Sequence, residues 1–332
     1  IYYLTGQRFF PGERLVLLHV SAGGSRLYLN ELSQEAGPIE GVETIRLALG
    51  DDALSRVIGG LGKEPLGVDK SLPARYLVPL IRETGLDPRT GGVAVASDAV
   101  DRARARKDAR EQAYMAESSE INDRAMGRFE KLIVEGATER GLQEQLRGIY
   151  LELGADDIAF GFPAFGANAA EPHHMSNGTE IREGDCVVLD VGCIKRGYYS
   201  DMTRTFFFRS APERHREIYE VVRQANEAAE RLARPGARFS DLDRAARGVI
   251  AAAGYGKHFI HRLGHSIGLQ VHEPGDVSEY NDGLIEEGMV FSVEPGIYLP
   301  GEMGVRIEDL VLAVPGGCRL LNHYPKELRV VG

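Results

Sequence analysis

The chain has 332 residues, of which 43% are hydrophobic and 27% charged, a composition typical of a globular protein in water. Its formal net charge of −10 at pH 7 and its pI of about 5.5 argue against nucleic acid or an anionic membrane surface as the main partner. The length predicts about two domains, and no apolar run approaches the ~18 residues that a membrane span needs.

The first hundred residues alternate strand-like and helical segments, which predicts a small α/β domain. Residues 15–20, 25–29 and 91–96 are predicted strands, and residues 79–84 a short helix that starts at Pro79 and ends before Gly85. This part contains no phosphate loop and no dinucleotide fingerprint. Because the chain starts at Ile1, in a strand-like segment, rather than at Met, we expect this domain to be truncated at its start.

Residues 100–150 are rich in Arg, Ala, Glu and Gln at helical spacing. We interpret the basic run 101–107 as a solvated linker helix and place the domain boundary near residue 110, which gives domains 1–110 and 111–332. The three cysteines (Cys186, Cys193 and Cys318) have no metal-type spacing. They are typical of reduced thiols in a cytoplasmic protein.

Residues 185–209 form an apolar stretch interrupted at 195–197, which predicts a β-hairpin. If Ile194 pairs with Gly197, Asp190 lies opposite Asp201, with the two Cβ atoms about 5 Å apart. Buried like charges at that distance repel each other unless a cation lies between them. The apolar neighbours weaken the alternative of two aspartates on a solvated face, but the pair alone does not decide between the two interpretations.

Two helices are predicted next, over residues 213–232 and 239–253, and they are followed by a histidine-rich segment. Within residues 259–274, His261, His265 and His272 alternate with apolar residues and glycines. Gly264 and Gly268 would let the backbone approach a ligand closely. Three histidines in one such segment are harder to explain as ordinary core residues than one would be.

The same segment also fits the G-x-S-x-G pattern of serine hydrolases, centred on Ser266, with Asp309 and His323 following in the right order for a triad. A nucleophile elbow needs a helix after the serine. Here a short apolar run is closed by Glu273, Pro274 and Gly275, which cannot open a helix. We therefore reject a serine nucleophile.

The apolar β-runs 289–298 and 304–312 each contain one glutamate, Glu294 and Glu308, and a loop at 299–303 lets the runs pair antiparallel. A buried carboxylate is costly unless it has a partner. A structural ion pair between Arg306 and a glutamate would explain one of these residues but not both.

Together these segments supply four carboxylates and one imidazole, from Asp190, Asp201, His265, Glu294 and Glu308. Such ligands suit a pair of divalent ions, with Mn²⁺ or Co²⁺ mildly favoured over Zn²⁺. The four negative charges balance two 2+ ions and leave room for a bridging water held as hydroxide. The constellation therefore predicts a dinuclear metal centre that hydrolyses amides or esters.

The order Asp, Asp, His, Glu, Glu, with the second aspartate eleven positions after the first, resembles the pita-bread metallopeptidases over residues 160–310. These comprise methionine aminopeptidases, aminopeptidases P and prolidases. The resemblance implies that Asp190 is terminal on one ion, that Asp201 and Glu308 bridge both, and that His265 and Glu294 complete the other. It also implies a small creatinase-like α/β domain followed by a catalytic domain with a curved, mostly antiparallel sheet covered by helices.

Further residues match the proline-specific branch of this family: His173, His261, His272, Tyr298 and Arg306. The N-terminal domain is also a mark of that branch. The short first domain and the sequence Val271-His272-Glu273-Pro274 resemble prolidase more than aminopeptidase P. The resemblance also implies a homodimer, with short proline-containing peptides as substrates and neither nucleic acid nor membrane as a partner.

The predicted reaction is hydrolysis of the bond before proline in Xaa-Pro dipeptides. Metal ions would lower the pKa of the water toward about 7. Glu294 would take the water's proton and deliver it to the proline nitrogen, His261 and His272 would donate hydrogen bonds to the oxyanion and the substrate, and His173 would help to bind the substrate.

Three alternatives remain: aminopeptidase P acting on longer peptides, a creatinase-like metal-free hydrolase, and a non-enzymatic binding protein of the same fold. The intact metal ligands argue against the last two.

Overall fold

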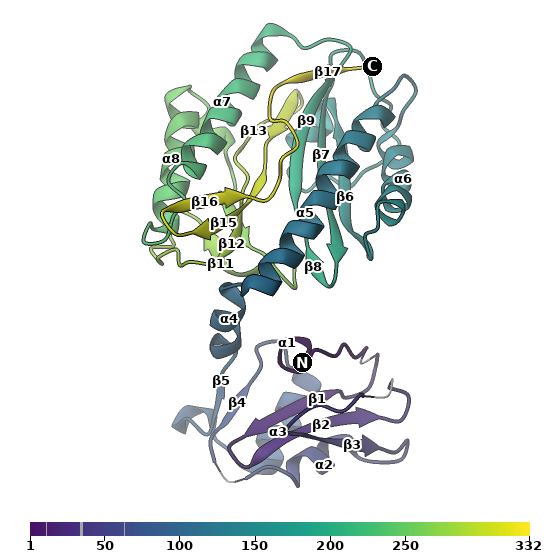
Figure 1. The fold of residues 1–332 in the computed structure, drawn as a ribbon, viewed down its shortest axis with the longest axis vertical. Helices are drawn as coiled ribbons and strands as arrows, with labels where there is room; N and C mark the ends of the chain where they lie inside the picture. Colours follow the sequence, from purple (N-terminus) through teal and green to yellow (C-terminus); the bar gives the residue numbers. More distant parts are fainter. Residues whose placement is uncertain (11, 34–35, 63) are drawn as a thin grey trace. The chain divides into compact units, whose positions relative to one another are not determined.

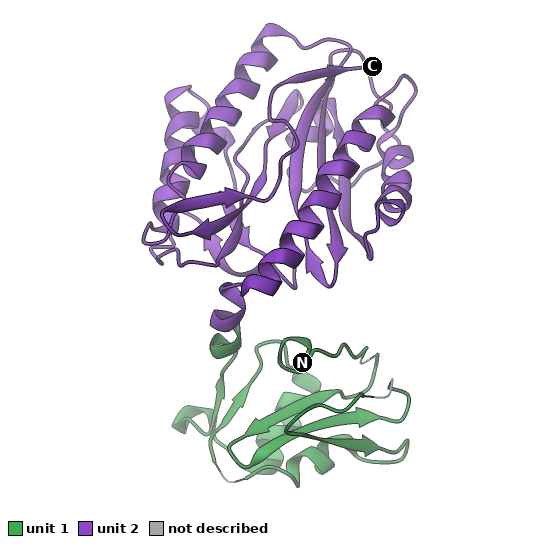
Figure 2. Ribbon diagram, in the orientation of Figure 1, with its two compact units in different colours: residues 1–100 green, residues 101–332 purple. Residues whose placement is uncertain are grey.

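The computed structural model describes residues 1–10, 12–33, 36–62 and 64–332. It divides the chain into two compact units, Ile1–Val100 and Asp101–Gly332, which are coloured separately in Figure 2. The fold is of the mixed α/β class, as the sequence predicted (Figure 1). Within the described residues, no helix has the length and apolar character that a membrane crossing requires.

Unit 1 contains α1 Tyr2–Thr5, β1 Leu17–Ser21, β2 Gly24–Asn30, β3 Val42–Leu47, α2 Ala53–Ile58, β4 Leu66–Val68, α3 Ala74–Thr84, the 3₁₀ turn η1 Pro88–Thr90 and β5 Val93–Val95. β1 and β2 form an antiparallel hairpin, β2 and β3 are parallel, and β4 pairs with β5 in parallel. The strands predicted at 15–20, 25–29 and 91–96 are confirmed as β1, β2 and β5.

Two local predictions in unit 1 are wrong. The segment that follows Ile1 is a short helix, not a strand. Helix α3 begins at Ala74, directly after Pro73, so Pro79 lies inside it rather than at its start. A helix tolerates an internal proline at the loss of one backbone hydrogen bond, and here the amphipathic pattern around Pro79 outweighs that loss. Gly85 ends the helix as predicted, with a left-handed φ of 68°.

Unit 2 contains the following α-helices and 3₁₀ turns (η): α5 Ala109–Phe129, η2 Glu130–Leu132, α6 Glu139–Glu152, η3 Gly166–Ala170, α7 Glu213–Glu230, α8 Phe239–Ala252 and η4 Gly256–His258. Helix α4, Asp98–Ala105, begins just before the division between the units. A capping box formed by Asp108 and Glu111 starts α5, which is why the helical run breaks after α4.

The basic run at 101–107 is only partly solvated, which corrects its interpretation as a solvated linker. Arg106 is exposed and pairs with Glu286. Arg104 and Lys107 instead turn inward onto the buried Glu273, and the Lys107 side chain is 1% exposed. The helical spacing of the run puts some of its cations on the face that packs against the rest of unit 2.

The strands of unit 2 form two larger sheets and one separate hairpin. The first sheet has the order β17-β9-β7-β6, with β8 paired to β7, and the second has the order β11-β10-β12-β15-β16. Pairing is antiparallel except between β17 and β9, so the expectation of a mostly antiparallel sheet is confirmed. The strands are β6 Asp157–Phe165, β7 Cys186–Lys195, β8 Tyr198–Tyr199, β9 Met202–Phe208, β10 Gly264–Ser266, β11 Glu273–Val277, β12 Val290–Val293, β13 Gly296–Leu299, β14 Met303–Arg306, β15 Asp309–Val314, β16 Gly317–Leu320 and β17 Arg329–Val331.

Strand β7 separates two apolar cores because its side chains alternate between the faces of the sheet. Val187, Leu189 and Val191 pack with residues of α5 and α6. Cys186 and Val188 pack in the core that contains residues of α7 and α8. Asp190 has the same parity as Val188, so its carboxylate lies on the face that looks toward the second sheet.

The predicted register of the β7 hairpin is wrong. Arg196 and Gly197 form the two-residue turn, with φ values of 50° and 83°, so Lys195 pairs with Tyr198. Turns with two positive φ values match the twist of a hairpin, and glycine adopts the second position without strain. The register is therefore shifted by two residues from the expected one, and Asp190 lies opposite Thr203 instead of Asp201.

The predicted antiparallel pairing of the two glutamate segments is confirmed, but the glutamates lie outside the strands. β12 pairs with β15 and β13 with β14 in one continuous register, in which Val293 faces Asp309 and Gly296 faces Arg306. Glu294 occupies the break between β12 and β13, and Glu308 the break between β14 and β15. The shared register brings these two breaks opposite each other.

Candidate metal centre

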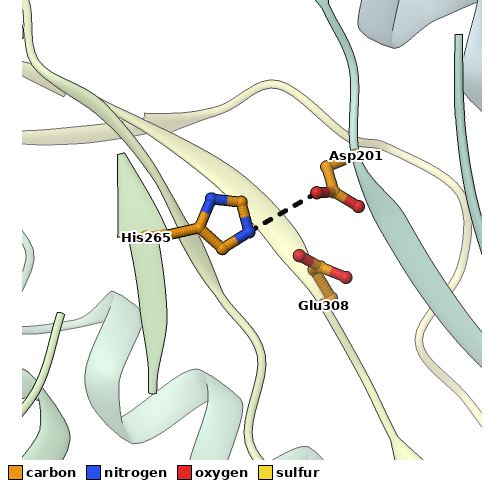
Figure 3. Close-up of side chains that lie close together, drawn as sticks. All are labelled: Asp201, His265 and Glu308. Carbon is orange, nitrogen blue, oxygen red and sulfur yellow. Dashed lines mark ion pairs between the residues drawn. The ribbon is translucent and has the colours of Figure 1, made fainter. Parts of the chain in front are cut away.

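The centre of the candidate site consists of three buried side chains from three segments: Asp201, His265 and Glu308 (Figure 3). One ligand atom of each lies within 4.8 Å of the others, and the distance from His265 Nε2 to Asp201 Oδ2 is 3.6 Å. Asp201 lies between β8 and β9, His265 on β10 and Glu308 after β14. The three residues therefore meet where the two sheets of unit 2 adjoin.

The other two predicted ligands border this centre. Glu294 Oε1 lies 3.4 Å from His265 Nε2 and accepts a hydrogen bond of 3.0 Å from Ser292. Asp190 accepts a hydrogen bond of 2.8 Å from Arg306, and its charge raises the pKa of Asp201, Glu294 and Glu308. The charge of Asp190 thus acts on the other three predicted carboxylate ligands.

The imidazole of His265 is prepared to act as a ligand through Nε2. Nδ1 lies 3.2 Å from the carbonyl oxygen of Ser266, and because a carbonyl only accepts, Nδ1 carries the proton. Burial lowers the pKa of His265 to about 3, so the ring is neutral at pH 7. The unprotonated Nε2 then faces Asp201 and Glu294, an arrangement in which the second ring nitrogen fixes the tautomer of a metal ligand.

The carboxylates repel one another in the absence of a cation. Burial, followed by the charges of Glu308, Asp190 and Glu294, holds the pKa of Asp201 well above its usual range. Burial and the charges of Glu294 and Asp190 do the same to Glu308. Burial raises the pKa of Glu294 to about 7, against the opposing effect of Arg306.

One oxygen atom of this donor set has no hydrogen-bond partner in the described part of the chain. Asp201 Oδ1 is buried and has no hydrogen-bond partner within the described residues. A buried oxygen without a partner is costly, and the cost is removed when the oxygen coordinates a cation. Four carboxylates and one neutral imidazole converging around such an atom fit divalent metal ions.

Arg306 forms hydrogen bonds with three residues next to or among the predicted ligands. Its guanidinium donates 2.8 Å to Asp190, 3.1 Å to Thr203 Oγ1 and 2.9 Å to the hydroxyl of Tyr298. The structural Arg306–glutamate pair considered from the sequence is therefore not the arrangement found. Arg306 orients Asp190, and through Thr203, which donates 2.7 Å to Glu308, it also supports a second predicted ligand.

His261 has its two ring nitrogens engaged. Nδ1 lies 2.7 Å from the carbonyl oxygen of Arg262, and Nε2 lies 2.9 Å from the hydroxyl of Tyr298. Burial lowers the pKa of His261 to about 4, so the ring is neutral: Nδ1 donates to the carbonyl and Nε2 accepts from Tyr298. The ring has no second N–H to offer an oxyanion, which differs from the donor role that the sequence suggested.

Two of the four histidines predicted to belong to the site, His272 and His173, are exposed. The ring of His272 packs edge-on against His265, with ring centroids 4.2 Å apart. His173 acts electrostatically on both His261 and His272. The imidazoles of His272 and His173 are therefore accessible to a ligand.

The residues of the rejected serine triad lie in different environments. Ser266 donates 3.0 Å to the carbonyl of Gly275. Asp309 pairs with Arg204 and Lys326, and His323 is 74% exposed next to Asp123. Ser266 therefore has neither an imidazole base nor a carboxylate in the position that a triad needs.

Sequence reasoning missed two supporting residues, Thr203 and Ser292. Ser292 bonds both Glu294 and the backbone N–H of His265, and Thr203 links Glu308 to Arg306. Each is two positions from a predicted ligand, Thr203 after Asp201 and Ser292 before Glu294. The two-residue repeat of an extended chain puts such neighbours on the same face, and this spacing could have identified both residues from the sequence.

The similarity to known proteins extends over nearly the whole chain. The family model described as metallopeptidase family M24 matches residues 113–315. A Mycobacterium bovis protein named "Probable dipeptidase PepE" is 36% identical over 99% of this chain and 89% of the relative, and the Xaa-Pro dipeptidase of Pyrococcus horikoshii is 33% identical over 99% and 91%. The crystal structure of a prolidase from Thermococcus sibiricus has a TM-score of 0.91 and 32% identity, and covers 99% of this chain and 91% of that one. The chain therefore belongs to metallopeptidase family M24.

Proposed function

We propose that this metallopeptidase is an Xaa-Pro dipeptidase with two divalent metal ions, held by Asp190, Asp201, His265, Glu294 and Glu308. The observation that carries the proposal is the buried cluster of Asp201, His265 and Glu308, which Glu294 borders and in which Asp201 Oδ1 has no partner among the described residues. The similarity to an Xaa-Pro dipeptidase over 99% of the chain supports the choice of substrate.

When bound, the metal ions would supply Lewis acidity and lower the pKa of a water to about 7. Glu294 would accept the proton of the attacking water and deliver it to the proline nitrogen, which must be protonated to leave as an amine. Ser292 keeps the Glu294 carboxylate in place for this transfer. Glu294 combines this role with that of a ligand because its carboxylate lies at the border of the cluster.

The supporting residues divide into two groups. Arg306, Tyr298 and His261 form a hydrogen-bonded chain that ends on Asp190, so they would act as positioning residues. His272 and His173, which are exposed, would contact the substrate. We assign His272 to the reacting carbonyl because it packs against His265, and His173 to binding of the dipeptide.

The test is product analysis with Ala-Pro, Ala-Pro-Ala and Ala-Ala, using protein stripped with EDTA and then reconstituted with Mn²⁺, Co²⁺ or Zn²⁺. We expect metal-dependent cleavage of Ala-Pro alone, with two ions per chain by elemental analysis. Equal or better cleavage of Ala-Pro-Ala at its first bond would make the protein an aminopeptidase P. Cleavage of Ala-Ala alone, or of no substrate with two metals bound, would refute proline specificity.

We further propose that Mn²⁺ is the working metal and that the protein is a cytoplasmic homodimer whose N-terminal domain is creatinase-like. The comparison of reconstituted forms tests the metal. The mass in solution, measured by light scattering on the full chain, tests the dimer, which a monomer mass would refute.

A further inference from the structure

We propose that Glu139 and His174 form a buried anchor that positions His173 for binding the substrate. This inference rests on the proposed function, because it assigns a role to side chains that act through His173. Neither Glu139 nor His174 belongs to the metal centre or to the residues that surround it.

Glu139 is the first residue of α6, and its side chain is 0% exposed. Its two carboxylate oxygens accept four hydrogen bonds. Oε1 accepts from the backbone N–H of Phe165 at 2.8 Å and from Asn168 at 2.9 Å. Oε2 lies 2.8 Å from His174 Nε2 and accepts from the backbone N–H of Asn177 at 2.9 Å.

All four donors come from one segment, residues 165–177, and they lie on both sides of His173. A buried carboxylate is retained when donors satisfy it, and the N-terminus of a helix favours its negative charge. The backbone also joins the segment to the same helix end, since the N–H groups of Glu139 and Arg140 donate to the carbonyls of Thr179 and Asn177. The segment is therefore fixed to α6 mainly through one side chain.

The two adjacent histidines of this segment have different environments. His174 is 10% exposed and directs Nε2 to Glu139, and its backbone N–H closes a turn onto the carbonyl of Glu171. His173 lies inside that turn and is exposed. Burial of the His174 imidazole thus fixes the backbone position of the exposed His173.

The same segment also fits closely against β14, the strand that carries Arg306. A Cβ atom on Gly304 would lie 1.8 Å from the carbonyl oxygen of Ala169, within the η3 turn that Glu139 bonds through Asn168. Because glycine permits this contact, η3 packs directly on β14. The segment that carries His173 is therefore held by α6 through Glu139 and packs against β14 through η3.

The experiment uses His174 rather than Glu139, because Glu139→Gln would place an amide group against the N–H of Asn177 at a fully buried site and endanger folding. In His174→Leu the hydrogen bond to Glu139 is lost, whereas in His174→Gln the side-chain amide still offers a donor. Glu144→Gln, at an exposed position on the same helix as Glu139, controls for a change on α6 outside the anchor. Metal content and thermal unfolding of each variant are measured alongside activity.

We expect His174→Leu to raise KM for Ala-Pro about tenfold with little change in kcat, which is the signature of lost binding. We expect His174→Gln to recover most of this loss and Glu144→Gln to behave as wild type. The deciding comparison is a double-mutant cycle with His173→Ala. If His174 acts through His173, His174→Leu has no further effect on KM when His173 is absent.

The outcomes separate the two proposals. If wild type cleaves Ala-Pro but His174→Leu leaves KM unchanged, lowers only kcat, or multiplies the effect of His173→Ala, the anchor is refuted and the proposed function stands. If wild type does not cleave Ala-Pro with two metals bound, the proposed function falls and the anchor falls with it.

Discussion

Two groups of buried carboxylates in unit 2 have opposite electrostatic environments. Asp201 is 3% exposed and Glu273 is 6% exposed, so both have lost most of their hydration. For Asp201, burial and three neighbouring carboxylates all raise the pKa. For Glu273, burial also raises the pKa, but the charges of Lys107 and Arg104 outweigh it, and the net pKa is lowered.

The hydrogen bonds differ in the same way. Glu273 lies 3.0 Å from Lys107 Nζ and 2.5 Å from Arg104, and it accepts 2.8 Å from the backbone N–H of Leu269. Asp201 keeps an oxygen with no partner among the described residues. Burial of a carboxylate alone therefore does not indicate a ligand site. The informative combination is burial with like charges nearby and an oxygen left unsatisfied.

The largest expected effect is that of Asp201→Asn. The amide removes one negative charge and one ligand oxygen from the centre, so we expect metal binding and peptidase activity to be lost together. Elemental analysis and Ala-Pro hydrolysis measure the two losses, with circular dichroism as the check on folding. A folded, fully active Asp201→Asn protein would refute the assignment of these residues as the catalytic metal centre.

The second prediction concerns Glu273, the buried carboxylate that two cations neutralise. Lys107→Met leaves Glu273 buried with one of its two cations missing, and we expect the free energy of unfolding to fall by about 3 kcal/mol. Metal content should not change, because Lys107 contacts no residue of the centre. Arg106→Met is the matched control, since Arg106 pairs with Glu286 at the surface and its loss should change stability by less than about 1 kcal/mol. Equal effects of the two substitutions would refute the distinction.

The sequence predicted the elements of unit 2 well and singled out five candidate ligands, because both leave local signals. A charged residue in an apolar run, such as Glu294 or Glu308, is visible without knowledge of the fold. The partners of those residues are not visible in this way. The pairing of Arg306 with Asp190 joins residues 116 positions apart, and only the packing of the β13–β14 hairpin against the first sheet brings them together.

Register and side-chain direction were the weak points of the sequence analysis. The expected pairing of Ile194 with Gly197 places the turn at Lys195-Arg196, one residue before the observed turn at Arg196-Gly197, and this shift moves the partner of Asp190 by two positions. The inward direction of Lys107 depends on Glu273, which is 166 positions away. The buried Glu139 has the same explanation, because it is one acidic residue among several in a helix until residues 165–177 fold over it.

A third prediction compares how much bound metal stabilises the wild type, Lys107→Met and Asp201→Asn. A metal that binds only the folded protein stabilises it by about 2.7 kcal/mol at a free concentration 100 times its Kd. We expect this increment in wild type and in Lys107→Met, whereas in Asp201→Asn it should be absent. Thermal unfolding with and without EDTA, across a Mn²⁺ titration, provides the measurement. An equal increment in Asp201→Asn would mean that the metal binds elsewhere.

The smallest expected effect is a difference in the pH dependence of stability between wild type and Glu273→Gln. The folded pKa of Glu273 lies below its unfolded value, so ionised Glu273 stabilises the fold at neutral pH. This contribution is present above the unfolded pKa, near 4.5, and is lost as the pH falls through the folded pKa. Glu273→Gln should be less stable than wild type at pH 7, because Lys107 and Arg104 lose their counter-charge. The gap, which is the difference in the free energy of unfolding between the two proteins, should narrow below pH about 4.5.

Urea unfolding of both proteins at pH 7, 5 and 4 measures this gap. A gap that widens on acidification would mean that Glu273 is protonated in the folded protein, and its environment would then match that of Asp201 instead of opposing it.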